Sequence, residues 1–525
     1  MTPYLQLRLW LREATAIERR MASFAMLALC ALAVWALVPT TIHQHTLGLG
    51  PAVGTGASPG GATGAGDAGA ATGQVGGGDA AAGAASGSAA SGASSGAALA
   101  QASRSAQVTT TVPGRVGGPA SGQAPLTASD RGVTPDSIKV GFTILNLAGV
   151  SQAGIAEDLR TDTADVINAL VDNANKHGGV LGRKIVADAK PVDIINTDDQ
   201  QAKCLAFTET DKVFAVIDTI EYVFRAARTC FPIQHQTPLL TLLPGGSDEI
   251  RKAYPLQASL SKDDNRVMKD YVLSAKEAGF FDPAKGFKKL GLLDDDCDPA
   301  VINDPNDGLK AYLAKLAGIT SVDEFTVGCA IDQQEREPPH AAVQHRLDGV
   351  TNVMFVTTHV ALEPYMNTAQ SQGYKPTYYA SDYEGVTLDI ASHALNADQA
   401  DGMRAVSEYH SGDPLKVPEA QACSKILTDH GLPGITSYNH DFEALVLCEH
   451  LDLFVKAASL AGPNLTRAGF GMAVQGVGTV NGTVEDLAVF NQRGKITGGD
   501  AVSTVEWRRS CSCWAQVTPF RAAYG

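Results

Sequence analysis

The chain has 525 residues and a formal net charge of −15 at pH 7, with 56 acidic side chains against 41 basic ones. Nucleic-acid binding takes most of its affinity from basic side chains on phosphates, so an acidic chain without basic clusters is a poor candidate for that class. The length would allow about two to four domains of average size, but the composition changes sharply along the chain.

An apolar segment lies close to the N-terminus. Residues 21–38 are interrupted only by Ser23, and about 18 apolar residues is near the lower limit for a membrane-spanning helix. Four arginines precede the segment (Arg8, Arg12, Arg19 and Arg20), and the next Lys or Arg is Arg104. This asymmetry predicts a cytoplasmic region over 1–20 and an uncleaved, single-pass transmembrane signal anchor over 21–39 in the cell membrane, with the folded domain extracytoplasmic. A cleaved signal peptide is the alternative.

A long low-complexity segment follows the apolar one. From about residue 48 to residue 128 the chain consists of Gly, Ala, Ser and Thr with scattered Pro and almost no charge. Such a composition cannot bury enough apolar surface to offset the entropy lost on ordering. We therefore predict a disordered linker over residues 40–130 and a folded domain over residues 131–525.

The folded part begins with a strand–helix–strand unit. An apolar, β-branched run at 138–144 predicts a strand, and apolar residues on one face between Val166 and Val171 predict a helix. Gly178 and Gly179 end that helix, because glycine accepts the left-handed backbone found at helix C-termini. A second strand begins at Lys184, so the unit is a βαβ crossover, which is right-handed in nearly all proteins.

Short apolar runs and helical patterns continue to alternate along the rest of the chain. The expected strands are 213–217, 238–243, 289–293, 323–328, 352–356, 377–380, 484–490 and 501–508, and the expected helices are 224–231, 265–278, 308–317, 340–347, 364–372, 418–430 and 438–460. Continuous apolar strands of this length are typical of parallel sheets covered on both faces. The predicted fold class is α/β, with two parallel-sheet lobes, a hinge and an interlobe cleft that binds a ligand.

Four segments resemble a known family. They are the strand entry at 132–141, NANKHGGVLGRK at 173–184, PGGS at 244–247 and ADGM at 400–403. Together they resemble the branched-chain amino-acid type of extracellular solute-binding protein, the substrate-binding component of ABC transporters with the type I periplasmic-binding fold. The resemblance implies hinge crossings near 257–261, 403–411 and 480–487, with lobe one over about 131–258 and 412–480 and lobe two over about 259–405 and 481–525.

The resemblance implies where a ligand carboxylate would bind. In that family, hydroxyls and backbone N–H groups after the third and fourth strands hold it, and the matching positions are Thr219, Gly246 and Ser247. Helix N-termini suit anions because their unpaired N–H groups point at the ligand. The third-strand loop departs from the family pattern, since Asp218 and Glu221 would repel a carboxylate. The alternative is that both are solvated helix caps.

The resemblance also implies a site for an ammonium group. The family uses a glutamate from lobe two, and Glu384 occupies the matching place after the expected strand at 377–380. A carboxylate facing an ammonium group makes a charge-assisted pair. Tyr383 beside it and His359, on the expected loop after 352–356, complete the candidate ligand-binding set. The alternatives are a surface glutamate in a turn and an ordinary polar histidine.

A run of three carboxylates, Asp294-Asp295-Asp296, ends the expected strand at 289–293. Three acids at the end of a strand could hold a cation or a cationic ligand. The alternative, which the sequence favours, is a turn followed by a helix cap.

The cysteines fit the implied fold. Of nine cysteines, eight follow residue 200, and an even number in an exported domain favours disulfides. Cys204 and Cys230 fall on successive crossover helices, Cys297 and Cys329 follow successive strands, and Cys423 and Cys448 fall on successive helices. Cys511 and Cys513 would close on each other only with strain, or take other partners. No CxxC pair is present, so the spacing predicts no zinc site.

The motifs favour binding over catalysis. The folded part contains no GxSxG nucleophile elbow, and HExxH and the P-loop pattern are absent from the chain. We expect no enzyme activity, no cofactor, no metal site and no nucleic-acid partner. The expected function is capture of a small polar ligand, an amino acid or related compound, for an ABC importer with its permease subunits as partners. The alternative is a membrane-tethered ligand sensor or surface interaction protein that is not coupled to transport.

Overall fold

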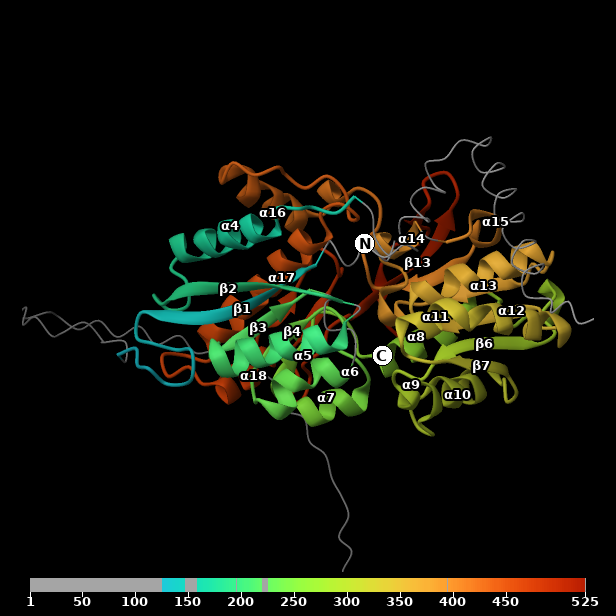
Figure 1. Ribbon diagram of the computed structural model, residues 1–525, viewed down its shortest axis with the longest axis horizontal. Helices are drawn as coiled ribbons and strands as arrows, with labels where there is room; N and C mark the ends of the chain where they lie inside the picture. The colour runs from blue at the N-terminus through green and yellow to red at the C-terminus, as the bar shows by residue number, and fades with distance from the viewer. Residues whose placement is uncertain (1–124, 147–157, 195, 220–224, 394, 525) are drawn as a thin grey trace, which may run out of the picture. The chain divides into compact units, whose positions relative to one another are not determined.

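The computed structural model describes five stretches of the chain, namely 125–146, 158–194, 196–219, 225–393 and 395–524 (Figure 1). All of them belong to the structural unit Pro113–Gly525. The predicted anchor at 21–39 and the linker as far as residue 124 lie outside these stretches. Among the helices of the described stretches, none combines the length and apolarity needed to cross a bilayer.

The first sheet is parallel throughout and has the strand order β2-β1-β3-β4-β5. Its strands are β1 (Ser137–Leu145), β2 (Lys184–Val192), β3 (Ala215–Asp218), β4 (Leu239–Thr241) and β5 (Gln257–Ala258). β1 and β2 pair in parallel along their full length, with Ser137 opposite Lys184. The predicted βαβ unit is confirmed, and α4 (Thr163–Lys176) is its crossover helix.

The end of α4 shows why the sequence needs glycine there. The helix buries Val166, Ile167 and Leu170 on one face and stops at Lys176. Gly178 and Gly179 then have φ values of 101° and 55°, a left-handed conformation that costs glycine little. A Cβ at Gly179 would also collide with a backbone carbonyl oxygen of the following turn. The two glycines therefore serve the turn into β2.

Helices cover both faces of the first sheet. They are α4, α5 (Thr197–Leu205), α6 (Arg225–Arg228) and α7 (Ser247–Ala253), joined by α16 (Pro418–Asp429), α17 (Phe442–Leu460) and α18 (Arg467–Val474) from later in the chain. Figure 1 shows α4, α16 and α17 on one side of β1 and β2, and α5, α6 and α7 on the other. Short π-helical segments continue α5 and α6. Lobe one is thus built from two separate parts of the chain.

The second sheet is mixed, with the strand order β14-β13-β10-β9-β8-β6-β7 and with β15 paired to β13. Its strands are β6 (Leu290–Asp295), β7 (Asp323–Val327), β8 (Asn352–Val356), β9 (Thr377–Ala380), β10 (Arg404–Ser407), β13 (Ala501–Arg508), β14 (Cys513–Gln516) and β15 (Arg521–Ala522). The five strands from β7 to β10 are parallel, whereas β13 runs antiparallel to β10. The prediction of a purely parallel second lobe is therefore wrong at its C-terminal edge, because β13 enters from lobe one and turns back into β14.

Side chains of the second sheet alternate between two cores. Leu292 and Met354 pack on one face with α8 (Asp264–Glu277), whereas Leu293 and Phe355 pack on the other with α13 (His359–Ser371). The remaining helices of this lobe are α9 (Pro299–Asn303), α10 (Leu309–Tyr312), α11 (Ile331–Arg336), α12 (Pro338–Leu347), α14 (Asp389–Ser392) and α15 (Ala397–Ala400). Because both faces of these strands are buried, successive residues are apolar, which explains the continuous apolar runs in the sequence.

The described chain passes between the two sheets after β5, after β10 and before β13. Ser259 forms a β-bridge with Thr497, and Tyr409 forms one with Glu485, so the three crossing segments lie side by side. A two-stranded sheet, β11 (Gly478–Val480) with β12 (Ala488–Phe490), precedes the third crossing. Phe490 packs in the same apolar core as residues of β1, β3 and β4.

Four disulfides join the eight cysteines of the folded part, in the pairs Cys204–Cys230, Cys297–Cys329, Cys423–Cys448 and Cys511–Cys513. The first joins α5 to the segment after α6, the second joins the loops after β6 and β7, and the third joins α16 to α17. The first three pairs are those that the element order predicted. The CxC closes on itself, one of the two outcomes that the sequence left open.

Candidate functional site

The loop after β4 meets the start of α8 from the other lobe. Ser247 opens α7, and its N–H donates to Asn265 Oδ1 at 2.8 Å, while its hydroxyl donates to Asp263 Oδ1 at 2.6 Å. These are the two donors that the resemblance assigned to a ligand carboxylate. In this structure, side chains of the chain itself occupy both of them.

Gly246 lies in this loop against side chains of lobe two. It is the N-cap of α7 and has an extended backbone, with φ −73° and ψ 160°. A Cβ built at Gly246 would lie 2.6 Å from Asp298 Oδ2 and 3.3 Å from Asn265 Oδ1. A larger residue at this position would therefore require the Asp298 carboxylate to move.

The residues at the end of β3 form hydrogen bonds to the neighbouring strands of the sheet. Thr219 is fully buried, and its N–H donates to Thr143 Oγ1 at 3.3 Å. Asp218 is also fully buried and accepts hydrogen bonds from Thr143 and Thr241, at 3.1 and 2.8 Å. The alternative of a solvated cap is therefore wrong for Asp218, because the carboxylate ties the ends of three strands together. Glu221 lies outside the described residues.

Arg228 and Glu249 form a buried ion pair next to the loop after β4. Arg228 Nε donates to Glu249 Oε1 at 2.7 Å, and its Nη2 donates to Oε2 at 3.0 Å, a two-point pairing that fixes the guanidinium. Burial would lower the pKa of Arg228, but the charges of Glu249, Glu384 and Asp264 outweigh it and raise the pKa. The sequence analysis missed this arginine, which is the last residue of α6, a four-residue helix that begins with Arg225.

Glu384 comes from lobe two and has an unusual backbone. It sits inside a short 3-10 turn, Tyr383–Gly385, with φ 47° and ψ 33°, a left-handed conformation that is costly for a residue with a Cβ. Burial raises its pKa to about 8, and the charge of Arg228 opposes that shift. Its Oε2 is buried and accepts no hydrogen bond. Strain of this kind is often found at functional sites.

Asp295 lies next to this turn at the end of β6. Its side chain is 2% exposed, and its Oδ1 accepts hydrogen bonds from the Cys297 N–H at 3.1 Å and the Tyr383 hydroxyl at 3.3 Å. Burial raises its pKa to about 7, against the lowering effect of the Cys297 N–H and of the Thr357 and Tyr383 hydroxyls. Tyr383 therefore connects Asp295 to Glu384: its hydroxyl donates to Asp295, and Glu384 is the next residue in the chain.

Asp294 and Asp296, the other two acids of the run, hydrogen-bond to β7 and to the loop that follows it. Asp294 accepts a hydrogen bond from Thr326 on β7 at 3.1 Å, and Asp296 accepts one from the Cys329 N–H at 2.6 Å. The helix cap that the sequence favoured is made instead by Asp298, which accepts from the Ala300 N–H at the start of α9. Of the three, only Asp295 joins the site.

Asp264 and Asp298 complete the acidic cluster, and the sequence analysis missed both. Asp264 is the first residue of α8, and burial and the charge of Glu384 raise its pKa well above the usual range. Asp298 acts on the pKa of both Asp264 and Glu384. An Asp before a proline at the start of a helix was the available signal for Asp298. We call Asp264, Asp295, Asp298 and Glu384 the interlobe acid cluster.

His359 lies in a helix and is not the loop residue that the sequence predicted. It begins α13, which runs from His359 to Ser371 and contains Pro364. Its Nε2 is buried without a hydrogen bond, and burial alone lowers its pKa to about 4, so the ring is neutral near pH 7. The structure does not link it to the interlobe acid cluster through any hydrogen bond or charge effect among the described residues.

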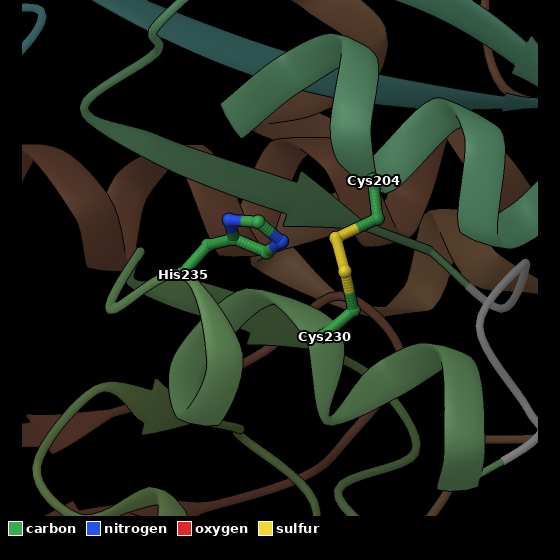
Figure 2. Close-up of side chains that lie close together, drawn as sticks. All are labelled: Cys204, Cys230 and His235. Carbon is green, nitrogen blue, oxygen red and sulfur yellow. A yellow bond between two sulfur atoms is a disulfide. The ribbon is translucent and has the colours of Figure 1, made fainter. Parts of the chain in front are cut away.

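One group of side chains in the described part of the chain has the spacing of a metal site. Cys204, Cys230 and His235 place three ligand atoms within 4.8 Å of one another, and Figure 2 shows the imidazole beside the two sulfurs. The sulfurs are joined in a disulfide, and His235 Nδ1 pairs with Glu209 Oε1 at 2.7 Å. The group is therefore a covalent crosslink with a histidine–glutamate hydrogen bond beside it.

Three solved structures illustrate the similarity of the fold. A possible leucine/isoleucine/valine-binding protein from Rhodopirellula baltica is 16% identical, covers 75% of this chain and 98% of its own, and has a TM-score of 0.53. A leucine-binding protein from Thermotoga maritima is 12% identical, with coverages of 73% and 99% and a TM-score of 0.52. A solute-binding protein of an ABC transporter from Rhodopseudomonas palustris, in complex with 3,4-dihydroxybenzoic acid, is 14% identical, with coverages of 74% and 98% and a TM-score of 0.51.

The comparison with sequence families reaches the same fold. No curated protein matches the chain. The family described as periplasmic binding protein matches residues 137–509, which include the first sheet, the strands β6 to β10 and β13 of the second sheet, and the three crossings between the sheets. A match over more than half of the chain shows the family directly, and the chain therefore belongs to the periplasmic binding protein family.

Proposed function

We propose that this chain is an extracytoplasmic solute-binding protein that captures a small polar ligand between its two lobes. The family supports this class of function, and the carboxyl ends of both sheets carry the charged side chains described above. Parallel sheets bind their ligands beyond the carboxyl ends of the strands, because loops and helix N-termini gather there. The ligand-binding residues that we propose in lobe two are Tyr383 and Glu384.

One relationship carries the proposal. Glu384 of lobe two and Arg228 of lobe one influence each other's pKa, although they come from different lobes. The backbone of Glu384 is held in a left-handed conformation, with φ 47°, and its Oε2 lacks a hydrogen-bond donor. A strained residue with an unused buried acceptor, placed between two lobes, is well suited to accept a hydrogen bond from a ligand.

Delivery to a transporter is the second part of the proposal. Solved structures of similar fold include a substrate-binding protein of an ABC transporter from Desulfitobacterium hafniense in complex with Leu, which has a TM-score of 0.50. By analogy we propose ABC permease subunits as partners and an amino acid or a related compound as ligand. The analogy rests on fold, so the ligand has to be identified by experiment.

The test is a ligand screen on the full-length protein. A compound that binds the folded state only should stabilise it by about 2.7 kcal/mol at 100 times its Kd. The panel contains amino acids, amides, amines and short-chain acids, and the readout is the free energy of unfolding in urea. Glu384→Gln should abolish the stabilisation by the ligand found. If the variant responds as the wild type does, the proposed site is wrong.

A tethered sensor is the second candidate. The sequence places an apolar segment at 21–39 before a long Gly/Ala/Ser-rich linker, and a long tether suits a sensor or surface protein better than a carrier that must meet its permease. Both roles predict membrane association and ligand binding. Co-purification with permease subunits would separate them, because only the transport role requires that partner.

A further inference from the structure

We propose that the Cys511–Cys513 disulfide is a site of thiol–disulfide exchange, at which a dithiol transfers two electrons to the protein. The site lies in the hairpin turn between β13 and β14 in lobe two, and Cys513 is the first residue of β14. This activity goes beyond solute binding, because it is a covalent step at an exposed turn of the chain.

The disulfide between these two cysteines crosslinks very little of the chain. Its cysteines are 2 residues apart, whereas the other three disulfides join cysteines that are 25, 26 and 32 residues apart. In the chain-entropy account, a crosslink stabilises a fold less when it closes a shorter loop. Crosslinking therefore explains this pair less well than it explains the other three.

The hairpin is held in place by contacts that do not involve the disulfide. Trp507 and Trp514 lie opposite each other on β13 and β14, and both are fully buried. Their indole N–H groups donate to the backbone carbonyls of Ser392 and Val386, each at 3.1 Å. The Ser392 hydroxyl also donates to the Ser512 carbonyl at 3.0 Å. Reduction of the disulfide should therefore leave the turn in place, with the two thiols near enough to pair again.

The two sulfurs differ in their exposure to solvent. Cys511 is exposed, and Cys513 is half-buried. In contrast, Cys204 and Cys230 are both fully buried. The rate of exchange depends on which sulfur an incoming thiolate can reach. A thiolate from solution therefore attacks Cys511, and Cys513 is the leaving group.

Arg508 lies beside the leaving sulfur. Arg508 and Cys513 are directly opposite each other in the antiparallel pairing of β13 with β14. Residues in that relation project from the same face of a hairpin, with Cβ atoms about 4.5–5.5 Å apart. The neighbouring pair of tryptophans points into the core, so Arg508 and Cys513 project from the other face. A guanidinium at this position stabilises a thiolate and makes it a better leaving group.

The exchange takes place in two steps. A thiolate of the dithiol attacks Cys511 Sγ, the bond between the two cysteines breaks, and Cys513 leaves as a thiolate. The second thiolate of the dithiol then attacks the substrate sulfur of the mixed disulfide, which closes the substrate's own disulfide and releases Cys511. The dithiol loses two electrons and two protons, and the two cysteines gain them and end as thiols.

The test follows the reduction of the full-length, folded protein by two probes. One probe is dithiothreitol, and the other is a peptide with two cysteines. Samples are alkylated at intervals, and mass spectrometry identifies the cysteines that have become free. The Cys511–Cys513 pair should be reduced about tenfold or more faster than each of the other three pairs. Reaction with either probe supports the site, and the ratio of the two rates shows whether a small dithiol or a peptide is the better substrate.

Two arginine variants test the assignment of the leaving group. Arg508→Gln should slow reduction of the pair by about threefold, because the departing thiolate loses its neighbouring cation. Arg509→Gln is the matched control. It removes the same charge from the next residue, whose guanidinium is already paired with Asp398 at 2.6 Å. Its rate should equal that of the wild type.

A second measurement separates an electrostatic role of Arg508 from a structural one. In a Cys511→Ser protein, Cys513 is a free thiol, and its rate of alkylation at a fixed pH reports the fraction present as thiolate. Adding Arg508→Gln should lower that rate by about threefold, whereas adding Arg509→Gln should leave it unchanged. A purely structural role of Arg508 predicts no change in either double variant.

Two results would contradict the proposal. Cys297 and Cys329 are also half-buried. If the Cys511–Cys513 pair is reduced no faster than that pair, it is a structural crosslink and the exchange site is wrong. Equal slowing by Arg508→Gln and Arg509→Gln would overturn the role of Arg508, because a general loss of positive charge would account for both.

Discussion

Ser247 Oγ donates a 2.6 Å hydrogen bond to Asp263 Oδ1, which joins the first residue of α7 in lobe one to the N-cap of α8 in lobe two. The same carboxylate oxygen accepts from the Arg266 N–H at 3.3 Å and so caps α8. One carboxylate therefore both starts a helix and links the lobes.

Removing the hydroxyl should loosen the contact between the lobes. Ser247→Ala deletes a hydrogen bond to a charged acceptor, and we expect a loss of about 1–2 kcal/mol in the free energy of unfolding, measured in urea. Ser371→Ala is the control, because that exposed hydroxyl donates only to Thr368 in its own helix. Equal losses in the two variants would contradict the role assigned to Ser247.

Replacing Glu384 by glycine should make the protein more stable but unable to bind its ligand. Glu384→Gly relieves a left-handed conformation with φ 47°, and we expect it to raise the free energy of unfolding by about 1 kcal/mol while it abolishes ligand binding. Lys212→Gly, at an exposed position with φ 53°, should stabilise to a similar extent without any effect on binding. A destabilised Glu384→Gly protein would show that the strain is absent.

The hinge contains a buried pair of acids. Glu485 follows β11, and its Oε1 accepts a hydrogen bond from Ser261 on the first crossing segment, while it faces Glu449 on α17. Burial and the neighbouring Glu449 raise the pKa of Glu485 well above its usual range.

This pair should make stability fall as pH rises. The folded state binds the proton more tightly than the unfolded state, in which the pKa of glutamate is about 4.3. Stability is therefore greatest below that value and decreases as pH rises towards the folded pKa of Glu485. Glu485→Gln keeps a neutral group of similar shape, and its urea midpoint should vary less between about pH 5 and pH 8. Glu335→Gln, exposed on α11, should leave the wild-type slope unchanged.

The disulfides should differ in their contribution to stability. Cys204 and Cys230 are fully buried and 26 residues apart, whereas Cys511 and Cys513 are 2 apart. A crosslink that closes a longer loop restricts the unfolded chain more, so replacing both cysteines by alanine should cost about 3.5 kcal/mol for the first pair and about 1.5 kcal/mol for the second. Urea unfolding of the two double variants measures the difference, and similar losses would refute the loop-length argument.

Several helices and strands were predicted correctly from the local sequence. The strand at Thr377–Ala380 was predicted residue for residue, and α8 and α12 were predicted to within a few residues. A strand's apolar run and a helix's periodicity are visible within a short window, and Gly178 ends α4 by its own backbone preference. These signals need no knowledge of what packs where.

Other elements were misread because local signals competed. The helix α13 was expected to begin at Pro364, since proline favours the first turn of a helix, but it begins at His359 and contains Pro364. The helix α7 was missed because its start, at Ser247, lies in a glycine-rich turn. The strands β5 and β10 have only 2 and 4 residues. Segments this short are too brief to show a recognisable hydrophobic pattern in the sequence.

The sequence by itself determined the α/β class, the order of most strands, the cysteines that pair and the position of Glu384 at a strand end. Only the tertiary structure decided what surrounds that glutamate. Arg228, Asp264, Asp295 and Asp298 come from separate segments of both lobes, and Ser247 finds its partner across the interface. Periodicity and turn chemistry are local, whereas burial and charge pairing depend on which segments the packing of two sheets brings together.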